Sequence, residues 1–506
     1  MQFGVCEKSI QGTPPIPRLG SRSALFRALF GAVNLTRHLF GLLPAGSARP
    51  SRLRSWNACR NGIDAPHNGR RPVVWFEVED FLRYFDHFRN PTGLQRVPFE
   101  IFAEAERLYG RSGGVRFCRL SVYTKQFQAI GFDEIVSAYA NPPGANAPWK
   151  SIWAPARIWS ELTSVLPMIR RHPGFFLSIA KIAVRDVMFA RRRRRGFERS
   201  VQRGDIVVSL GAGWGFPRYV EHIARAKRRY GIRFATLIHD LIPIESDSFV
   251  EPWHVEQFRN WLHDAIPVAD VLLTISRYSR EALIRWAAQT GRQLPRVEVV
   301  QLGSGDRLPA TRQSAMSFPQ RYVLFVSTIE IRKNHRLLVR VWQRLLERHG
   351  CDAVPALIFA GQIGWMVDDL MAELAAGGYA DGKILLMPGL SEAELQQAYG
   401  SCLFTVFPSL SEGWGLPVAE SLAHGKLCVA SNRTSIPEVG GDLVDYFDPS
   451  NEDDALAKIE RALLDPDYLA AREARLRAEY RPRSWADCAR SLVGKLGEPL
   501  PTGNEK

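Results

Sequence analysis

From residue 320 onward, short apolar segments alternate with longer amphipathic ones, and this alternation constrains the fold more than any other feature of the chain. The apolar segments are rich in Val, Ile, Leu and Phe, as buried strands are, and the segments between them have helical periodicity. Strands that are each separated by one helix form a parallel sheet with right-handed crossovers. We therefore expect strands at 322–327, 356–360, 384–387, 403–407 and 427–430, and helices at 333–348, 366–376, 391–400, 417–424 and 451–464.

The preceding part of the chain shows the same alternation less clearly. Expected strands here are 73–78, 114–122, 205–210, 234–238 and 271–275, and an expected helix covers 93–108. Polar, turn-forming residues without periodicity suggest a linker at 306–319. The sequence thus predicts two similar α/β domains with a cleft between them. Their expected bounds are 72–305 and 320–481, with a basic leader at 1–71 and a C-terminal helix and tail at 482–506.

The chain has a formal charge of +14, and most of this excess lies at its beginning. Residues 1–71 contain eleven Lys or Arg and only two acidic residues. Segments 25–43 and 175–190, the second followed by arginines at 191–195, are apolar but interrupted by charges, so neither is expected to span a bilayer. A basic amphipathic helix can instead lie on anionic headgroups, so contact with a membrane surface is one interpretation of these segments. The alternatives are a plain exposed helix and, for residues 1–71, a transit peptide or a wrongly assigned start.

Three classes of protein are disfavoured by the sequence. The seven cysteines include no CxxC pair and no histidines at ligand spacing, which argues against a disulfide framework or a zinc site and favours a reducing cytosol. A nucleic-acid binder would use its positive charge, but here the excess lies mainly in the leader and the arginine run. A dinucleotide-binding dehydrogenase or epimerase would need a GxGxxG after its first strand, and none follows the expected one.

The segment from Phe407 to Gly425 carries the most chemical information. A strand is expected to end at Phe407, a turn rich in Ser and Gly exposes backbone amides, and Pro417 stands where the first helical position is expected. The N-terminus of this helix favours an anion through its unpaired N–H groups and its dipole. Glu412 in the turn and Glu420 in the helix can each accept hydrogen bonds from sugar hydroxyls. A pair of helix-capping carboxylates is the alternative.

This segment resembles the Glu, seven residues, Glu signature of glycosyltransferase family 4, whose members are retaining enzymes that use nucleotide sugars. The resemblance implies the α/β fold called GT-B, in which two Rossmann-like domains with parallel sheets face each other across a cleft. The first domain would bind the acceptor and the second the nucleotide sugar. Glu420 would then bind the ribose, and Glu412 would contact the donor sugar. The remaining donor-binding groups would be the backbone amides of Gly413, Trp414, Gly415 and Leu416.

A second match is the run Val-Ser-Thr-Ile-Glu-Ile-Arg-Lys-Asn at 326–334, which resembles the strand, acidic loop and lysine that open the second domain in this family. Lys333 falls on the position that holds the donor diphosphate. Many members carry an arginine five residues earlier, where this chain has Thr328, so Arg332 is the expected second cation. Fixed cations stabilise the charge that builds on a departing diphosphate, and no metal ion or other cofactor is then expected to be obligatory.

Two motifs in the first domain resemble a bacterial polysaccharide branch of the same family. The run Asn-Pro-Thr-Gly-Leu-Gln-Arg-Val at 90–97 is similar to a loop and helix start that faces the donor phosphates, which makes Gly93 a candidate binding residue. The run Leu-Ile-His-Asp at 237–240 is similar to a loop whose histidine touches the transferred sugar. His239 is therefore a candidate catalytic residue with Glu412 and Lys333. A histidine that only makes a structural hydrogen bond is the alternative.

Together these residues predict a glycosyltransferase that moves a mannose-like hexose from a nucleoside-diphosphate sugar to a lipid-linked or growing cell-surface polysaccharide. The expected partners are the donor, the acceptor and a membrane surface, without nucleic acid. The expected location is the cytoplasm, at the inner face of the cytoplasmic membrane. A non-catalytic assembly factor with the same fold is the alternative, although such a factor would be expected to lose the charged site residues that this chain retains.

Overall fold

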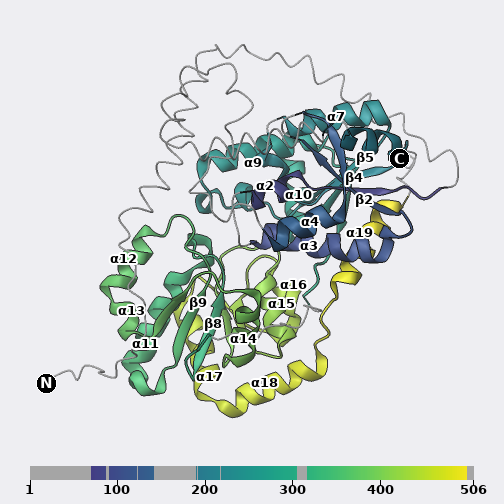
Figure 1. Ribbon diagram of the computed structural model, residues 1–506. Helices are drawn as coiled ribbons and strands as arrows, with labels where there is room; N and C mark the ends of the chain where they lie inside the picture. Colours follow the sequence, from purple (N-terminus) through teal and green to yellow (C-terminus); the bar gives the residue numbers. More distant parts are fainter. Residues whose placement is uncertain are drawn as a thin grey trace, which may run out of the picture. The chain divides into compact units, whose positions relative to one another are not determined.

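The computed structural model describes residues 70–86, 91–121, 124–141, 190, 192–216, 218–304 and 316–498. These residues form two β-sheets with their helices (Figure 1) and belong to one compact unit, residues 63–145 and 184–506. The basic leader up to residue 69, nearly all of the candidate membrane-surface segments and most of the expected linker lie outside the described residues. No helix among the described ranges is long and apolar enough to cross a membrane.

Among the described residues, the first sheet has seven strands in the order β3-β2-β1-β4-β5-β6-β7. Neighbouring strands are parallel, except that β2 and β3 pair antiparallel. The strands are β1 (Val74–Glu77), β2 (Val115–Leu120), β3 (Phe127–Ile130), β4 (Ile206–Ser209), β5 (Arg233–Ile238), β6 (Val271–Thr274) and β7 (Arg296–Val299). The five predicted strands are confirmed, but the sheet is mixed rather than wholly parallel. β3 and β7 were not expected, because one is a short hairpin partner and the other an edge strand that alternates Arg and Glu with Val.

Helices connect these strands in chain order. They are α2 (Glu79–Phe85), α3 (Gly93–Ala105), α4 (Phe132–Ala140), α7 (Tyr219–Tyr230), α8 (Ile242–Glu245), α9 (Pro252–Ala265) and α10 (Arg277–Gln289), with shorter turns η4 (Glu106–Gly110), η7 (Gly213–Gly215) and η8 (Asp247–Phe249). The core beneath them also contains residues from the end of the chain. Trp485, Cys488 and Leu492 of α19 (Trp485–Gly497) are buried in the same cluster as Val74 and Phe76. The chain therefore returns to the first sheet after completing the second.

The second sheet, in the described part of the chain, has six parallel strands in the order β10-β9-β8-β11-β12-β13. They are β8 (Tyr322–Val326), β9 (Ala356–Ala360), β10 (Ile384–Met387), β11 (Thr405–Phe407), β12 (Cys428–Ser431) and β13 (Asp445–Phe447). The connecting elements are η9 (Ile331–Lys333), α11 (His335–Ala353), α12 (Asp368–Ala376), α13 (Gly378–Asp381), α14 (Glu392–Ser401), α15 (Leu416–Ala423), α16 (Ile436–Gly440), η10 (Gly441–Leu443), α17 (Glu452–Leu464) and α18 (Pro466–Glu479). The predicted alternation of strand and helix is confirmed, with β13 in addition.

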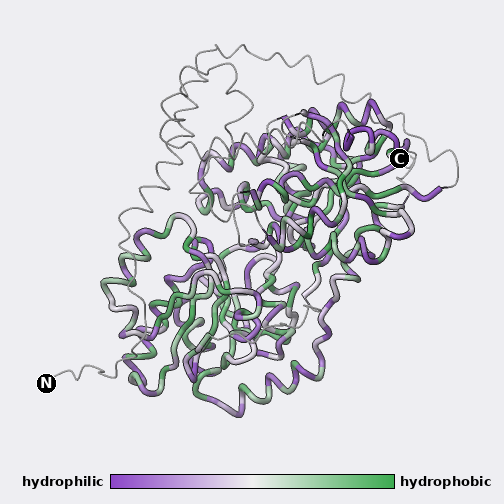
Figure 2. The backbone as a smooth tube through the Cα atoms, viewed as in Figure 1, coloured by the Kyte–Doolittle hydropathy of each residue, from purple (hydrophilic) through white to green (hydrophobic). Residues whose placement is uncertain are grey.

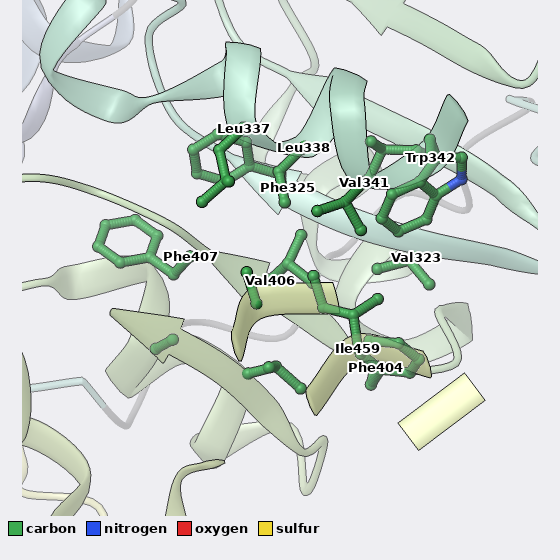
Figure 3. Packing of buried hydrophobic residues seen from close by; sticks show 14 of the residues in the cluster. Val323, Phe325, Leu337, Leu338, Val341, Trp342, Phe404, Val406, Phe407 and Ile459 are labelled. Atoms are coloured by element: carbon green, nitrogen blue, oxygen red, sulfur yellow. The ribbon is translucent and has the colours of Figure 1, made fainter. Parts of the chain in front are cut away.

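Apolar packing against these strands stabilises the second sheet. Figure 3 shows Leu338, Val341 and Trp342 of α11 directed toward strand residues such as Val323 and Phe325. Trp342 is fully buried, and its indole N–H donates to the carbonyl of Pro355 at 3.1 Å. Figure 2 shows hydrophobic residues concentrated along the strands, while the helices alternate between hydrophobic and hydrophilic stretches. This amphipathic pattern keeps the strand ends, where ligands of parallel sheets bind, on a rigid scaffold.

Candidate active site

The turn after β11 and the helix α15 form the centre of the candidate site. Gly415 has φ of +111°, in a conformation that glycine adopts readily, and the helix begins immediately after it at Leu416. Pro417 therefore stands at the second helical position, one residue later than predicted. Gly425, with φ of +69°, follows the helix end as expected. The predicted turn, helix and glycine stop are present in the expected order.

Glu412 lies in this turn and binds both expected cations. Lys333 Nζ donates to Glu412 Oε1 at 2.5 Å, and an Arg332 guanidinium nitrogen lies 2.9 Å from Oε2. Ser409 Oγ also donates to Oε1, at 2.6 Å. Burial alone would raise the pKa of this carboxyl, but Arg332 and Lys333 lower it to about 2. Glu412 is therefore ionised at neutral pH.

The two cations differ in their surroundings. Burial and the charge of Arg332 lower the pKa of Lys333. Burial would also lower the pKa of Arg332, but Glu412 and Glu330 raise it overall, and Arg332 pairs with Glu330 at 2.6 Å. Lys333 lies in the turn η9 rather than inside the predicted helix at 333–348, which begins two residues later at His335. Because this turn follows β8, both cations stand at the carboxyl end of a central strand.

His239 follows β5 in the first sheet and is nearly fully buried. Its Nε2 lies 2.8 Å from the carbonyl oxygen of Leu210. A carbonyl only accepts hydrogen bonds, so Nε2 carries the hydrogen, and Nδ1 of the neutral ring keeps its lone pair. Burial lowers the pKa of His239, which keeps the ring neutral at physiological pH. His239 therefore makes the structural hydrogen bond of the alternative interpretation and still offers one ring nitrogen as an acceptor.

Gly413 brings the loop after β5 against the turn after β11. A Cβ placed on Gly413 would lie 2.5 Å from the carbonyl oxygen of His239 and 3.0 Å from Cβ of Asp240. No side chain larger than hydrogen fits at that distance without a shift of backbone. Burial raises the pKa of Asp240, and the charges of Arg332 and Lys333 oppose that rise. The histidine of the first sheet and the Glu412 cluster of the second are thus neighbours.

Glu420 is held from two sides. Arg96 Nη2 donates to Glu420 Oε1 at 2.8 Å, and Tyr399 Oη donates to Oε2 at 2.8 Å. Arg96 stands in the first turn of α3, which begins at Gly93 as predicted and is closed by the capping pair Thr92 and Gln95. Apart from its chain neighbours and its own helix backbone, no described residue has an atom within 4 Å of a Cβ placed on Gly93, which leaves room for a ligand to approach the backbone there. The motif at 90–97 therefore reaches the predicted ribose-binding carboxylate through Arg96.

Thr434 and Ser435, two residues that were not predicted from the sequence, also support the site. Thr434 Oγ1 accepts from the Glu412 backbone N–H at 2.9 Å, and Ser435 Oγ donates to the Glu412 carbonyl at 2.8 Å. The Trp414 ring packs in the core cluster of the first sheet, and within the described chain its indole nitrogen has no hydrogen-bond partner. Thr434 and Ser435 follow β12, so the rule that ligands gather at carboxyl ends of strands could have indicated them.

Two comparisons of sequence place these residues among known proteins. The family model described as glycosyl transferases group 1 matches residues 310–483. The O-antigen chain mannosyltransferase B of Escherichia coli is 30% identical over 269 residues, which cover 52% of this chain and 69% of that protein. The serotype-specific mannosyltransferase WbdA of Escherichia coli is 27% identical over 278 residues, covering 53% of this chain and 34% of WbdA. The chain thus spans about two thirds of the first relative and one third of the second.

Solved structures share the architecture. The chain resembles Anabaena Alr3699/HepE, solved in complex with UDP and glucose, with a TM-score of 0.52 and 14% sequence identity over 85% of this chain and 100% of that one. It also resembles a glycosyltransferase from Rickettsia africae ESF-5, with a TM-score of 0.50 and 14% identity over 84% of this chain and 98% of that one. At this level of identity the likeness establishes the fold, two Rossmann-like α/β domains as in GT-B glycosyltransferases.

Proposed function

The chain belongs to the group 1 glycosyl transferases, and from that premise we propose that it transfers a mannose-like hexose, with retention of configuration, from a nucleoside-diphosphate sugar to a lipid-linked or growing polysaccharide. One observation carries the proposal: Lys333 and Arg332 both pair with Glu412, and the loop that contains His239 packs against Gly413 in the same turn. Two cations, an ionised carboxylate and a neutral imidazole are the groups that an activated sugar needs around it.

The donor diphosphate is proposed to bind at Lys333 and Arg332, in front of the N-terminus of α15. Both cations are now neutralised by carboxylates, Lys333 by Glu412 and Arg332 by Glu412 and Glu330. An entering diphosphate brings negative charge that these cations share with it, and the helix N–H groups add partial positive charge. As the sugar–phosphate bond breaks, charge grows on the departing phosphate, and fixed cations in a buried site stabilise that state more than the ground state. These groups supply the charge that a metal ion would otherwise provide.

The sugar and ribose are proposed to bind to the two carboxylates. Glu412 is ionised and accepts hydrogen bonds from hydroxyls of the transferred sugar. The lone pair on His239 Nδ1 accepts another, since Nε2 is held by the Leu210 carbonyl. Glu420 accepts from the ribose hydroxyls, and Arg96 and Tyr399 keep its carboxylate in position. The acceptor hydroxyl attacks on the face from which the diphosphate leaves, and a phosphate oxygen takes its proton.

The choice of mannose and of a cell-surface polysaccharide is supported by the relatives, which include two O-antigen or serotype mannosyltransferases. We propose the cytoplasm as the place of this reaction, with contact to the inner face of the cytoplasmic membrane where a lipid-linked acceptor is exposed. We also propose the domain bounds 72–305 and 320–481, joined by a linker at 306–319 and flanked by segments 1–71 and 482–506.

A thermal-shift screen with UDP-, GDP- and dTDP-sugars tests this function, because a ligand that binds only the folded state raises Tm. We expect one class of nucleotide sugar to raise Tm of the wild type. The same increase is expected for Lys458→Ala, an exposed lysine of α17, and a much smaller one for Lys333→Ala. An equal increase in Lys333→Ala would contradict the proposed donor site, and a transfer assay with the identified donor then tests catalysis.

A further inference from the structure

A cationic cavity lies beside α10, β7 and α19, away from the candidate active site. Its volume is about 530 Å³, within the range of small-molecule sites. Arg277 and Arg280 line it from α10, Glu298 from β7, and Lys495 from α19. Arg483, just before α19, completes the charged lining, and Ser491 adds a hydroxyl. Four cationic side chains and a single carboxylate therefore line the cavity.

The charges of this lining are only partly neutralised within the protein. Lys495 Nζ donates to Glu298 at 2.6 Å, and Arg277 pairs with Glu438 at 3.3 Å. The Arg280 side chain, by contrast, has neither a hydrogen bond nor an ion pair with any described residue. Arg483 reaches only the backbone carbonyl of Asp487, at 3.3 Å, and its buried Nε has no partner in the described structure. Two guanidinium groups thus remain without a carboxylate.

The cavity lies on the same edge of the sheet as His239. Val299 and Gln301, at the carboxyl end of β7, line it, and His239 follows the carboxyl end of β5. Only β6 separates these two strands, and neighbouring strands lie about 5 Å apart, so the two positions are about 10 Å apart across the sheet. A ligand held at the Val299 end of the cavity would therefore lie on the sheet edge that also carries His239.

We propose that this cavity binds a diphosphate group, separate from the diphosphate of the donor. A guanidinium matches phosphate oxygens with two parallel hydrogen bonds, which the unpaired Arg280 side chain can form. Arg483 can add a bond through Nη1, because its Nη2 donates to the Asp487 carbonyl and its Nε is buried. A single phosphate would satisfy the Arg280 fork, whereas a diphosphate also has oxygens for Arg483. The source of the group is the one part that rests on the proposed function: it belongs either to a lipid-linked saccharide acceptor, whose sugar extends toward His239, or to a free diphosphate compound.

The test is isothermal titration of the full chain with inorganic pyrophosphate. Two sites are expected, the cavity and the proposed donor site at Lys333. Arg280→Gln is the primary variant, because the side chain is exposed and unpaired and its loss leaves the fold intact. Arg259→Gln, an exposed and equally unpaired arginine of α9, is the matched control. We expect Arg280→Gln to lower the pyrophosphate affinity of one site about tenfold, and Arg259→Gln to change the affinity of neither site.

Adding Arg483→Gln is expected to lower the pyrophosphate affinity of the cavity about tenfold further. Lys333→Ala is expected to lower only the affinity of the proposed donor site. Pyrophosphate binding in Arg280→Gln that equals that of Arg259→Gln would overturn the proposal, as would loss of all binding in Lys333→Ala. A failure of the proposed function would instead appear as unchanged nucleotide-sugar binding in Lys333→Ala, whatever the result for Arg280→Gln.

Transfer assays then identify the source of the diphosphate. One acceptor is a saccharide on a polyprenyl diphosphate, and the other is the same saccharide without the diphosphate. A rise in KM of Arg280→Gln for the first acceptor alone identifies the lipid-linked acceptor as the ligand. Unchanged KM for both acceptors, together with weakened pyrophosphate binding, identifies a free diphosphate compound.

Discussion

Arg96 of α3 and Glu420 of α15 form an ion pair of 2.8 Å, and the Glu420 side chain is only 3% exposed to solvent. Tyr399 holds the second carboxylate oxygen at 2.8 Å. Both oxygens of the proposed ribose-binding group are thus engaged by protein before any nucleotide arrives. A carboxylate can accept about four hydrogen bonds, and we propose that ribose hydroxyls bind alongside Arg96 and Tyr399. The pair then orients Glu420 rather than blocking it.

Arg96→Ala is expected to lower the free energy of unfolding by about 1–3 kcal/mol, because it leaves a buried carboxylate with one charged partner fewer. Urea unfolding measures the change. Arg107→Ala, which removes a pair between the exposed Arg107 and Glu104, serves as the control and is expected to leave the free energy of unfolding essentially unchanged, because water screens that pair. Equal stability of the two variants would mean that the Arg96 pair is not formed in solution.

Lys333→Ala is expected to lower kcat by roughly 10²–10³-fold, because it removes a cation placed where charge develops on the leaving diphosphate. Glu420→Ala is expected to abolish transfer, because it removes the proposed ribose-binding carboxylate. Steady-state transfer with the donor found by thermal shift measures both, and Lys458→Ala controls for the loss of a lysine. Near-normal turnover of either site variant, with circular dichroism unchanged, would show that the site is assigned wrongly.

Gly413→Ala is expected to reduce both stability and transfer, since the added methyl group would lie 2.5 Å from the His239 carbonyl oxygen. The loop after β5 must move to accept it, and such a move displaces the candidate catalytic histidine. Gly494→Ala in α19 is the control: its Cβ meets open space, and alanine is about 1 kcal/mol better than glycine in a helix. If Gly413→Ala retained wild-type kcat, close contact between the two loops would not be needed for transfer.

Glu77, at the end of β1, supplies a test by pH. Burial, aided by the charge of Asp80, raises its pKa from 4.5 to about 8, while N–H groups of Leu120 and Glu79 oppose the rise. The folded state thus keeps a proton that the unfolded state releases, so Glu77 lowers stability as pH rises from 4.5 to 8. The side chain at this position in the variant Glu77→Gln is neutral at every pH. As pH rises from 4.5 to 8, the free energy of unfolding of this variant is expected to increase relative to that of the wild type, by at most about 1.4 kcal/mol per pH unit.

Urea unfolding of both proteins at pH 5, 6, 7 and 8 measures this difference, and titrating groups that do not interact with Glu77 contribute equally to both proteins. Tyr219 Oη, which donates to Glu77 at 2.9 Å, provides a control, since Tyr219→Phe removes a hydrogen bond without removing a carboxyl. A difference between wild type and Glu77→Gln that does not vary with pH would contradict the raised pKa.

The sequence predicted most of the second sheet because its strands are short, apolar and separated by single helices. The turn with Glu412 and the helix with Glu420 were also predictable, since glycine and proline mark a turn and a helix start whatever surrounds them. The contact between Arg96 and Glu420 was not, because 324 residues separate them and no local pattern encodes such a pairing. The same applies to α19, whose apolar face gave no indication that it packs on the first sheet rather than the second.

Local rules also misplaced some details. Lys333 was expected within a helix, but Asn334, with φ of +58°, separates the turn η9 from α11. Strand β7 escaped prediction because Arg296 and Glu298 alternate with its valines, and an edge strand tolerates polar residues that a central strand does not. Both departures reflect positions at element ends or sheet edges, where burial no longer dictates residue type.

The most direct test of the account compares nucleoside diphosphates with nucleosides. Isothermal titration of wild type and Lys333→Ala with UDP and GDP, and with uridine and guanosine, separates the diphosphate contribution from that of the base and ribose. We expect Lys333→Ala to lose at least about tenfold in affinity for the bound diphosphate and to keep its affinity for the nucleoside. Equal affinity of both proteins for the diphosphate would contradict the claim that Lys333 and the turn before α15 hold it.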